Sequence, residues 1–208
     1  MSSGIPVLIG TYRKRKHISA CIESVGQHLS GYGDITFVDD SGDPEHCDWL
    51  KQYGKVVSVG GRGYQTAMQA ACTEAAGREC FWLEEDFVFL EDVDLGELHD
   101  ILYHRPYLAQ VVLLRGPHFD IEHRHGGLIE ALQFKGHTFT TVTGIIEHTA
   151  CFSMNPTLIR GEVWAAGWPS GRWTEEIKGR TLVQQGYRFG YVPGIKVAHD
   201  GERTGHGY

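Results

Sequence analysis

Apolar runs alternate with amphipathic stretches over the first 90 residues of the chain. Four short apolar runs predict strands: residues 7–9, 35–38, 56–59 and 81–83. The stretches between them predict helices: residues 17–29, a short helix that begins at Pro44, and residues 64–76, which Gly77 closes. Because strands that alternate with helices form parallel sheets, we expect ligands at the carboxyl ends of these strands.

The second half of the chain has a less regular pattern. Four further runs predict strands: residues 111–114, 150–154, 188–192 and 195–198. Two further helices are predicted: one that Pro156 opens and one over residues 174–185, which stops at Gly186. The Gly- and His-rich segment 115–139 predicts a loop or a small ribbon. We therefore expect one domain over residues 1–208, with an α/β half followed by a mixed half.

Composition narrows the class of protein. With 208 residues the chain is long enough for a full core, and its net charge of −7 argues against a generally basic, nucleic-acid-coating surface. The five cysteines form no Cys-x-x-Cys pair, so reduced thiols in a cytoplasmic protein are the simpler interpretation. No signal peptide and no apolar stretch of about 20 residues is visible, so a membrane span is not expected.

Three consecutive carboxylates, Glu84, Glu85 and Asp86, follow the fourth predicted strand. Three acids at the end of a buried strand need a counter-charge, and a divalent metal with a phosphate on its far side would provide one. The alternative is a turn whose acids face water. Other polar residues that follow predicted strands are expected at the same edge: Thr11, Tyr12, Asp39, Asp40 and Arg62.

Four segments, taken in order, resemble the GT-A fold glycosyltransferases, and in particular the family 2 enzymes that use nucleotide sugars. Residues 35–43 resemble the acidic turn after the second strand, and residues 84–86 resemble the Asp-x-Asp motif. Residues 173–176 resemble the Thr-Glu-Asp segment that carries the catalytic base, and residues 186–199 resemble the closing strands with their metal-binding histidine. The resemblance implies a nucleotide-sugar-binding half over about residues 5–90 and an acceptor-binding, catalytic half over about residues 91–208.

The resemblance implies a metal-dependent, inverting transfer of one sugar from a nucleoside-diphosphate sugar, with a UDP-sugar favoured. Asp86 and His199 are the implied ligands of Mn²⁺ or Mg²⁺. Glu176 is the implied general base, and its neighbour Glu175 could exchange roles with it. Two positions depart from the family pattern, because Glu84 and Glu176 stand where the family usually has Asp. The processive Gln-x-x-Arg-Trp motif is absent, which suggests transfer of a single sugar.

The remaining candidates would hold the nucleotide. Asp39 and Asp40 would accept hydrogen bonds from the base or ribose, and Glu84 would contact the ribose or reach the metal through water. Phosphate and further nucleotide contacts are expected from the other residues at the strand ends: Thr11, Tyr12, Arg13, Arg62 and Glu85. The histidine-rich segment 115–139 would help to form the acceptor pocket rather than a zinc site, since it offers no cysteine.

The cationic run from Arg13 to Lys16 precedes a predicted helix, where the helix dipole disfavours cations. A bound anion would repair this, either the donor diphosphate or a nucleic-acid backbone, and a solvated charge run is the third interpretation. The acceptor therefore stays open: a small molecule, a glycan, a protein, or hydroxymethylpyrimidines in phage-type modified DNA. A nucleotidyltransferase and a non-catalytic nucleotide-sugar binder are the competing classes of function.

Overall fold

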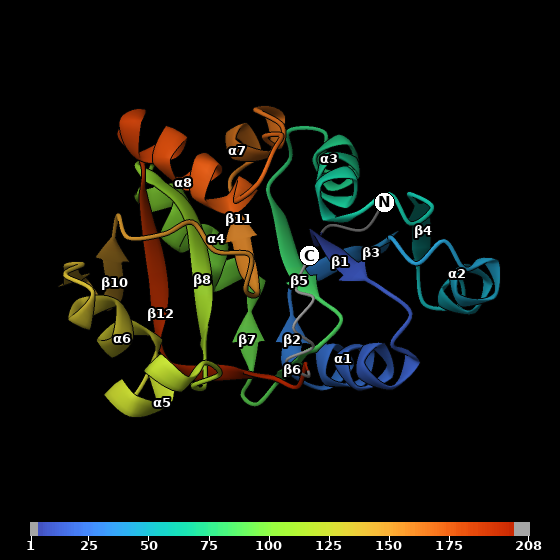
Figure 1. The fold of residues 1–208 in the computed structure, drawn as a ribbon, viewed down its shortest axis with the longest axis horizontal. Coiled ribbons are helices and arrows are strands. Elements are labelled where there is room, and N and C mark those ends of the chain that lie inside the picture. Colours follow the sequence, from blue (N-terminus) through green and yellow to red (C-terminus); the bar gives the residue numbers. More distant parts are fainter. Residues whose placement is uncertain (1–3, 202–208) are drawn as a thin grey trace.

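The computed structural model describes residues 4–201 and contains one large mixed sheet between two layers of helices (Figure 1). Four strands of the first half pair in parallel and lie in the order β4-β3-β1-β5. Their bounds are β1 (Ile5–Thr11), β3 (Tyr32–Asp39), β4 (Lys55–Ser58) and β5 (Cys80–Glu84). The carboxyl ends of all four therefore meet at one edge of the sheet, as the sequence predicts.

The second half extends the same sheet in the order β11-β8-β12-β10-β9. These strands are β8 (Leu108–Arg115), β9 (Phe139–Val142), β10 (Ile145–His148), β11 (Thr157–Ile159) and β12 (Arg188–His199). Because β11 is antiparallel to both β5 and β8, strands β8 and β12 run in the same direction as β5. The short strand β6 (Phe87–Phe89) pairs with the end of β12, and β2 (Leu29–Ser30) pairs separately with β7 (Val93–Asp94).

Amphipathic helices cover both faces of this sheet. One core cluster includes the buried side of α1 (Arg15–His28) and of α4 (Leu95–His104). The opposite cluster includes residues of α3 (Tyr64–Ala75), α7 (Gly161–Ala165) and α8 (Thr174–Gln184). Three shorter helices complete the fold: α2 (Pro44–Leu50), α5 (Asp120–His125) and α6 (Leu128–Phe134). Burial of apolar side chains on both faces is the main stabilising contribution.

Local chemistry sets the element boundaries that the sequence predicted best. Asp43 caps α2 by accepting hydrogen bonds from the backbone amides of Glu45 and His46, and Pro44 supplies the first helical residue. Helix α3 ends where Ala76 and Gly77 adopt positive φ angles of 49° and 73°. The first-half strands and helices are thus confirmed, with shifts of one to three residues at their ends.

Four predictions in the second half were wrong. Residues 115–139 contain the two helices α5 and α6 rather than a loop or ribbon. Residues 150–154 are not a strand, because the Gln110 side chain binds both the amide and the carbonyl of Ser153 and holds this segment off the sheet. Pro156 leads into strand β11 instead of a helix, and the two closing strands are one strand, β12, with irregular pairing around residues 192–197.

Helix α4 was not predicted, although Asp94 caps it and three leucines, Leu95, Leu98 and Leu102, form its buried side. Within residues 4–201, no helix is long and apolar enough to cross a membrane.

Candidate active site

The three consecutive acids leave the sheet in a tight turn after β5, so their side chains reach different surroundings. The Glu85 amide donates to the carbonyl of Gly10 (2.9 Å), which keeps the turn beside β1. The carbonyl of Asp86 accepts from the amide of Asp200 (2.8 Å), which ties the same turn to the end of β12. The turn therefore joins the first half of the sheet to the closing strand of the second half.

Asp86 and His199 lie together, as predicted, because β6 and β12 pair with Phe87 opposite His199. The His199 Nε2 atom lies 3.7 Å from Asp86 Oδ2, and both side chains are about one-fifth exposed. His199 also packs edge-on against Phe87 (4.7 Å between ring centroids) and against His118 (4.1 Å). Among residues 4–201, Asp86 Oδ1 and His199 Nδ1 are buried and have no hydrogen-bond partner, so both atoms could serve as ligand atoms.

The donor set fits a divalent metal. Burial lowers the pKa of His199, although the nearby Asp86 carboxylate opposes the shift, so the imidazole is neutral and can bind a metal at neutral pH. A Cβ atom on Gly201 would collide with Asp86 Oδ2 and approach His199 Cε1 to 2.6 Å, so this position accepts only glycine without rearrangement. Among residues 4–201, no group of three or more His, Cys, Asp or Glu side chains is arranged to hold a metal ion. A cation here would complete its shell with ligand and water oxygens.

Glu84 and Glu175 are a second pair of acids beside this site. Burial raises the pKa of Glu84 well above its ordinary value, and repulsion from Asp86 and Glu175 adds to the shift. Burial also raises the pKa of Glu175, while the hydroxyl that Tyr64 donates at 3.1 Å lowers it in part. Desolvated carboxyl groups with raised pKa values are candidates for proton transfer.

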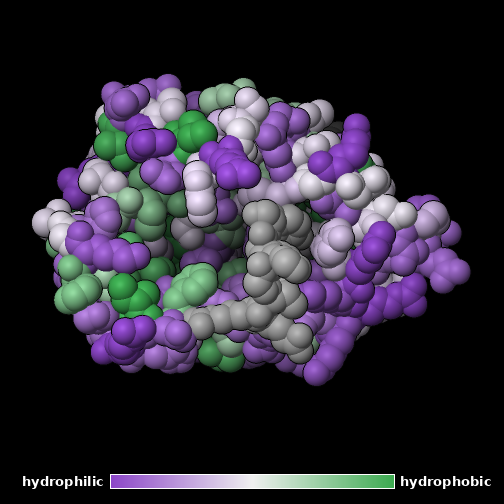
Figure 2. All heavy atoms as spheres, in the orientation of Figure 1, coloured by the Kyte–Doolittle hydropathy of each residue, from purple (hydrophilic) through white to green (hydrophobic). Residues whose placement is uncertain are grey.

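Both of these acids line a cavity of about 880 Å³ between α8 and the segment 149–152. Figure 2 shows the surface hollowed to the left of centre, with apolar surface along the hollow. Aromatic side chains contribute much of the wall: Tyr64, Phe119, Phe152, Trp173 and Phe189. Trp173, the N-cap residue of α8, has a positive φ of 59° and is 78% exposed at the surface.

The two predicted base candidates differ in their surroundings. Glu175 is half-buried and bonded to Tyr64, whereas Glu176 is 62% exposed and faces Arg180 at 3.7 Å. Both line the same cavity, in the first turn of α8. Glu175 and Glu176 therefore both line the cavity that Glu84 also lines.

The acidic turn after β3 uses its carboxylates within the fold. Asp39 is completely buried, and its Oδ2 accepts from the Ser41 hydroxyl at 2.9 Å, the Cys47 thiol and the Ser58 hydroxyl. Its Oδ1 lies 3.8 Å from His46 Nε2 and has no hydrogen-bond partner in the part of the chain that the structure describes. Asp40 accepts from the Gly63 amide at 3.0 Å and so fixes the glycine-rich loop before α3. Both residues shape the predicted nucleotide edge.

Thr11 and Glu85 form a buried link between β1 and the turn after β5. The Thr11 hydroxyl donates to Glu85 Oε2 at 2.7 Å and lies 3.0 Å from His46 Nε2. Burial raises the pKa of Glu85, and hydrogen bonds from Thr11 and the Tyr12 amide partly offset the increase. Glu85 therefore fixes the loop that begins at Tyr12, which is 40% exposed.

The predicted arginines are held by carbonyl groups. Arg13 Nε donates to the carbonyl of Ser41 at 2.8 Å, and Arg62 Nε donates to the carbonyl of Val59 at 2.6 Å. Arg15 lies over the Trp49 ring at 5.7 Å, and the first turn of α1 contains no acid. The cationic run thus begins at the acidic turn of β3, on the carboxyl side of the sheet.

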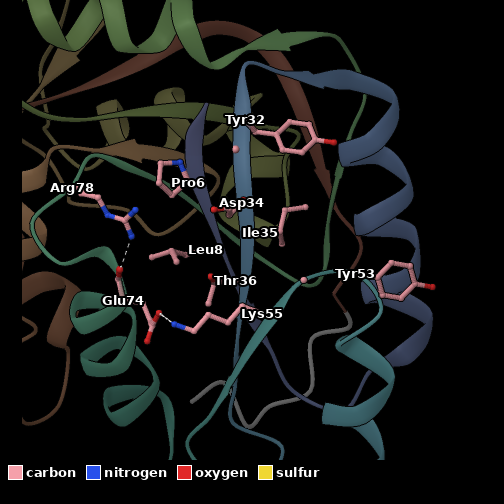
Figure 3. A pocket seen from close by; sticks show the side chains of 12 residues that line it. Pro6, Leu8, Tyr32, Asp34, Ile35, Thr36, Tyr53, Lys55, Glu74 and Arg78 are labelled. Atoms are coloured by element: carbon pink, nitrogen blue, oxygen red, sulfur yellow. Dashed lines mark hydrogen bonds and ion pairs between the residues drawn. The ribbon is translucent and has the colours of Figure 1, made fainter. Parts of the chain in front are cut away.

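A second cavity, of about 730 Å³, lies at the opposite edge, near the amino ends of β1, β3 and β4 (Figure 3). Three of its four charged lining residues, Lys55, Glu74 and Arg78, are engaged with one another or with backbone. Lys55 forms an ion pair with Glu74, and Arg78 Nη2 donates to the Glu74 carbonyl at 3.1 Å. Lys55 and Glu74 therefore offset each other's charge at this edge of the sheet.

Sequence reasoning missed Tyr64, His46 and Glu122 near the site. It placed His118 and Arg115 only within the segment expected to form the acceptor pocket. Tyr64 donates to Glu175, and His46 contacts Thr11. Arg115 and Glu122 form a buried ion pair beside His118. Only the position of Arg115 at the carboxyl end of a strand could have indicated its role, because the other contacts depend on tertiary packing.

No protein-family model matches this sequence, and no curated protein sequence matches it. Solved structures do resemble it. A mannosyltransferase from Pyrobaculum calidifontis, in complex with GDP-Man and Mn²⁺, aligns over 97% of this chain and 58% of its own, with a TM-score of 0.69 and 13% identity. TarS 1–349 of S. aureus, with UDP-GlcNAc, aligns over 99% and 61% (TM-score 0.64, 12% identity).

GalNAc-T7, with UDP, GalNAc and Mn²⁺, aligns over 94% of this chain and 43% of its own, with a TM-score of 0.69 and 14% identity. The chain thus spans roughly two-fifths to three-fifths of the length of these proteins. At this identity the likeness concerns the fold alone. Residues 4–201 therefore have the mixed α/β, GT-A fold that these glycosyltransferase structures share.

Proposed function

We propose that this chain is a metal-dependent glycosyltransferase that moves one sugar, with inversion, from a nucleoside-diphosphate sugar to an acceptor hydroxyl. The observation that carries the proposal is the Asp86–His199 pair at the carboxyl edge of the sheet, next to the acid-lined cavity. A fold shared with proteins crystallised with GDP-Man, UDP-GlcNAc or UDP supports this choice, and we favour a UDP-sugar as donor.

Asp86 and His199 would hold Mn²⁺ or Mg²⁺, since a carboxylate with a neutral imidazole suits Mn²⁺ well. The bound cation would offset charge on the leaving diphosphate. Asp39, Asp40 and the loop 11–13 would form the nucleotide side of the site, through the hydrogen bonds that fix their backbone.

The protein groups of the cavity would carry the proton transfer. The acceptor hydroxyl oxygen forms a bond to the anomeric carbon, the bond from that carbon to the diphosphate oxygen breaks, and the hydroxyl proton passes to a carboxylate. Of the two predicted bases, Glu175 is the better supported, because burial raises its pKa and Tyr64 fixes its orientation. Exposed Glu176 would then contact the acceptor or orient Arg180.

The acceptor remains a separate proposal. The aromatic walls of the cavity suit a ring-shaped group, which sugars and pyrimidine bases both provide. Arg13 and Arg15, the two arginines of the cationic run, contact Ser41 and Trp49, so they add no argument for a nucleic-acid acceptor.

A panel of nucleotide sugars tests the function, with release of nucleoside diphosphate measured with and without Mn²⁺. We expect Mn²⁺-dependent release from at least one donor, and loss of that release in Asp86→Asn. A binder without catalysis would retain nucleotide affinity but release nothing from any donor. A nucleotidyltransferase would instead release pyrophosphate from a nucleoside triphosphate.

A further inference from the structure

A buried ion pair lies beside the Asp86–His199 site at the carboxyl end of β8. Arg115 Nη1 and Nη2 donate to Glu122 Oε2 and Oε1 at 2.6 and 2.8 Å, and both side chains are about 95% buried. Such a bidentate pair has one geometry, which makes it suitable for fixing the segments that carry its members.

The ion pair closes a short turn, residues 116–119, that leads from β8 to α5. Glu122 Oε2 also accepts from the backbone amides of His118 (2.7 Å) and Phe119 (3.1 Å), while Arg115 Nη1 donates to the Gly116 carbonyl at 3.0 Å. Burial alone would raise the pKa of Glu122, but these hydrogen bonds and the guanidinium lower it to about 2, so it stays ionised. Every residue of the turn except Pro117 is thus bound to one side chain or the other.

The turn places the ring of His118 against the ring of His199, the proposed metal ligand. The His118 and His199 rings have centroids 4.1 Å apart at an interplanar angle of 50°. Arg115 itself lies opposite Val197 in the β8–β12 pairing, two residues before His199. The pair is therefore anchored on the strand next to β12 and reaches His199 from a second direction through His118.

We propose that Arg115 and Glu122 are positioning residues for the metal-diphosphate site, and that they act by holding His118 against His199. This inference rests on the proposed function, because it assigns a role within the same site. Phe119, which follows His118 in the same turn, lines the acceptor cavity, so one ion pair fixes a segment that contacts both parts of the site.

A merely stabilising role would have a different signature. Breaking a buried ion pair destabilises most folds, so a fall in melting temperature alone says nothing about the site. Arg115→Lys keeps the positive charge but loses the fork that binds both carboxylate oxygens. If orientation matters, this variant should lose nucleotide affinity; if only charge matters, it should not.

The experiment is a calorimetric titration of UDP in the presence of Mn²⁺ on the full chain, paired with thermal unfolding. We expect Glu122→Gln, Arg115→Lys and His118→Ala each to weaken UDP affinity by about 10- to 100-fold, the usual effect of losing a residue that orients a metal ligand. His118→Ala keeps the ion pair, so it tests the same contact even where Glu122→Gln does not fold.

Glu147→Gln is the matched control. Glu147 is also buried and faces two arginines, Arg105 at 3.6 Å and Arg188 at 3.5 Å, but it lies toward the opposite ends of β8 and β12. We expect it to lower the melting temperature without changing UDP affinity. Normal UDP affinity in both Arg115→Lys and His118→Ala, with tight binding by the unmodified protein, would overturn this inference alone. No Mn²⁺-dependent UDP binding by the unmodified protein would overturn the proposed function and this inference with it.

Discussion

The two edges of the sheet carry cavities of similar size and opposite character. At the carboxyl edge, Glu84 and Glu175 are desolvated next to other acids. Asp86 and His199 each have a buried polar atom with no hydrogen-bond partner within residues 4–201. At the amino edge, Lys55 and Glu74 are paired with each other. The cavity at the carboxyl edge has a volume of about 880 Å³ and the one at the amino edge about 730 Å³, so volume does not distinguish them. The difference teaches that uncompensated charge, which is costly to the fold, distinguishes the edge where we propose the active site.

The largest expected effect comes from the base. Glu175→Gln keeps shape and hydrogen bonding to Tyr64 but cannot accept a proton, so we expect turnover to fall about 10²- to 10⁴-fold with donor affinity nearly unchanged. Steady-state kinetics together with nucleotide titration measure both quantities. Glu176→Gln is the paired control and should lose far less. An inactive Glu176→Gln beside an active Glu175→Gln would assign the base to Glu176.

The metal pair should give the next largest effect. Asp86→Asn removes a charged ligand, so Mn²⁺-dependent nucleotide binding should weaken by roughly 100-fold, about 2.7 kcal/mol. His199→Ala should act in the same direction. Calorimetry with Mn²⁺ detects the change, and Asp92→Asn, at a 91% exposed acid that pairs with His28, serves as control. Unchanged binding in both variants would move the metal site elsewhere.

The uncompensated charge at the carboxyl edge should also appear in the stability of the fold. The folded-state pKa of Glu175 is raised by burial, so the native protein holds a proton more tightly than the unfolded chain and its stability falls as pH rises above about 4.5. Glu175→Gln should therefore raise the melting temperature at pH 7, and this gain should vanish below about pH 4. Glu74→Gln should show no such gain. A Glu175→Gln variant that is less stable at pH 7 would contradict the comparison.

A smaller effect is expected at the acidic turn. Arg13 donates one hydrogen bond to the Ser41 carbonyl, and its loss should cost about 1 kcal/mol of nucleotide binding, or roughly fivefold in affinity. Replacing both Arg13 and Lys14 with Ala also tests the nucleic-acid alternative. A flatter salt dependence of DNA binding with normal nucleotide affinity would favour a DNA acceptor.

Substitutions at the amino-edge cavity should have the smallest effect on stability and turnover. Lys55 is 60% exposed, so removing its pair with Glu74 through Lys55→Met should change the free energy of unfolding by no more than about 1 kcal/mol. We expect normal turnover in this variant, measured in the same assay as Glu175→Gln. A large loss of turnover would show that the amino-edge cavity takes part in the reaction.

The sequence predicted the first half better than the second for a physical reason. Residues 7–9 and 81–83 are apolar throughout, as buried parallel strands must be, and α3 carries its own stop signal at Gly77. In the second half, tertiary contacts decide: Gln110 holds Ser153 off the sheet, and the Arg115–Glu122 pair folds a turn that local pattern cannot indicate.

The candidate site likewise has one part that the sequence predicted and one part that depends on tertiary contacts. Pairing of Asp86 with His199 was predicted from the resemblance, and the structure brings them within 3.7 Å. The different environments of Glu175 and Glu176, which are adjacent in the sequence, depend on Tyr64 from another helix. Buried partners such as His46 and Glu122 were missed because their role lies in contacts across the fold.

The central claim is that the acids at the carboxyl edge hold a metal-bound nucleoside diphosphate. Its most direct test is a calorimetric titration of UDP into the unmodified protein, once with Mn²⁺ and once with a chelator. We expect clear saturable binding with Mn²⁺ and at least tenfold weaker binding with the chelator, a difference of about 1.4 kcal/mol or more. Equal affinity in the two conditions would contradict the claim.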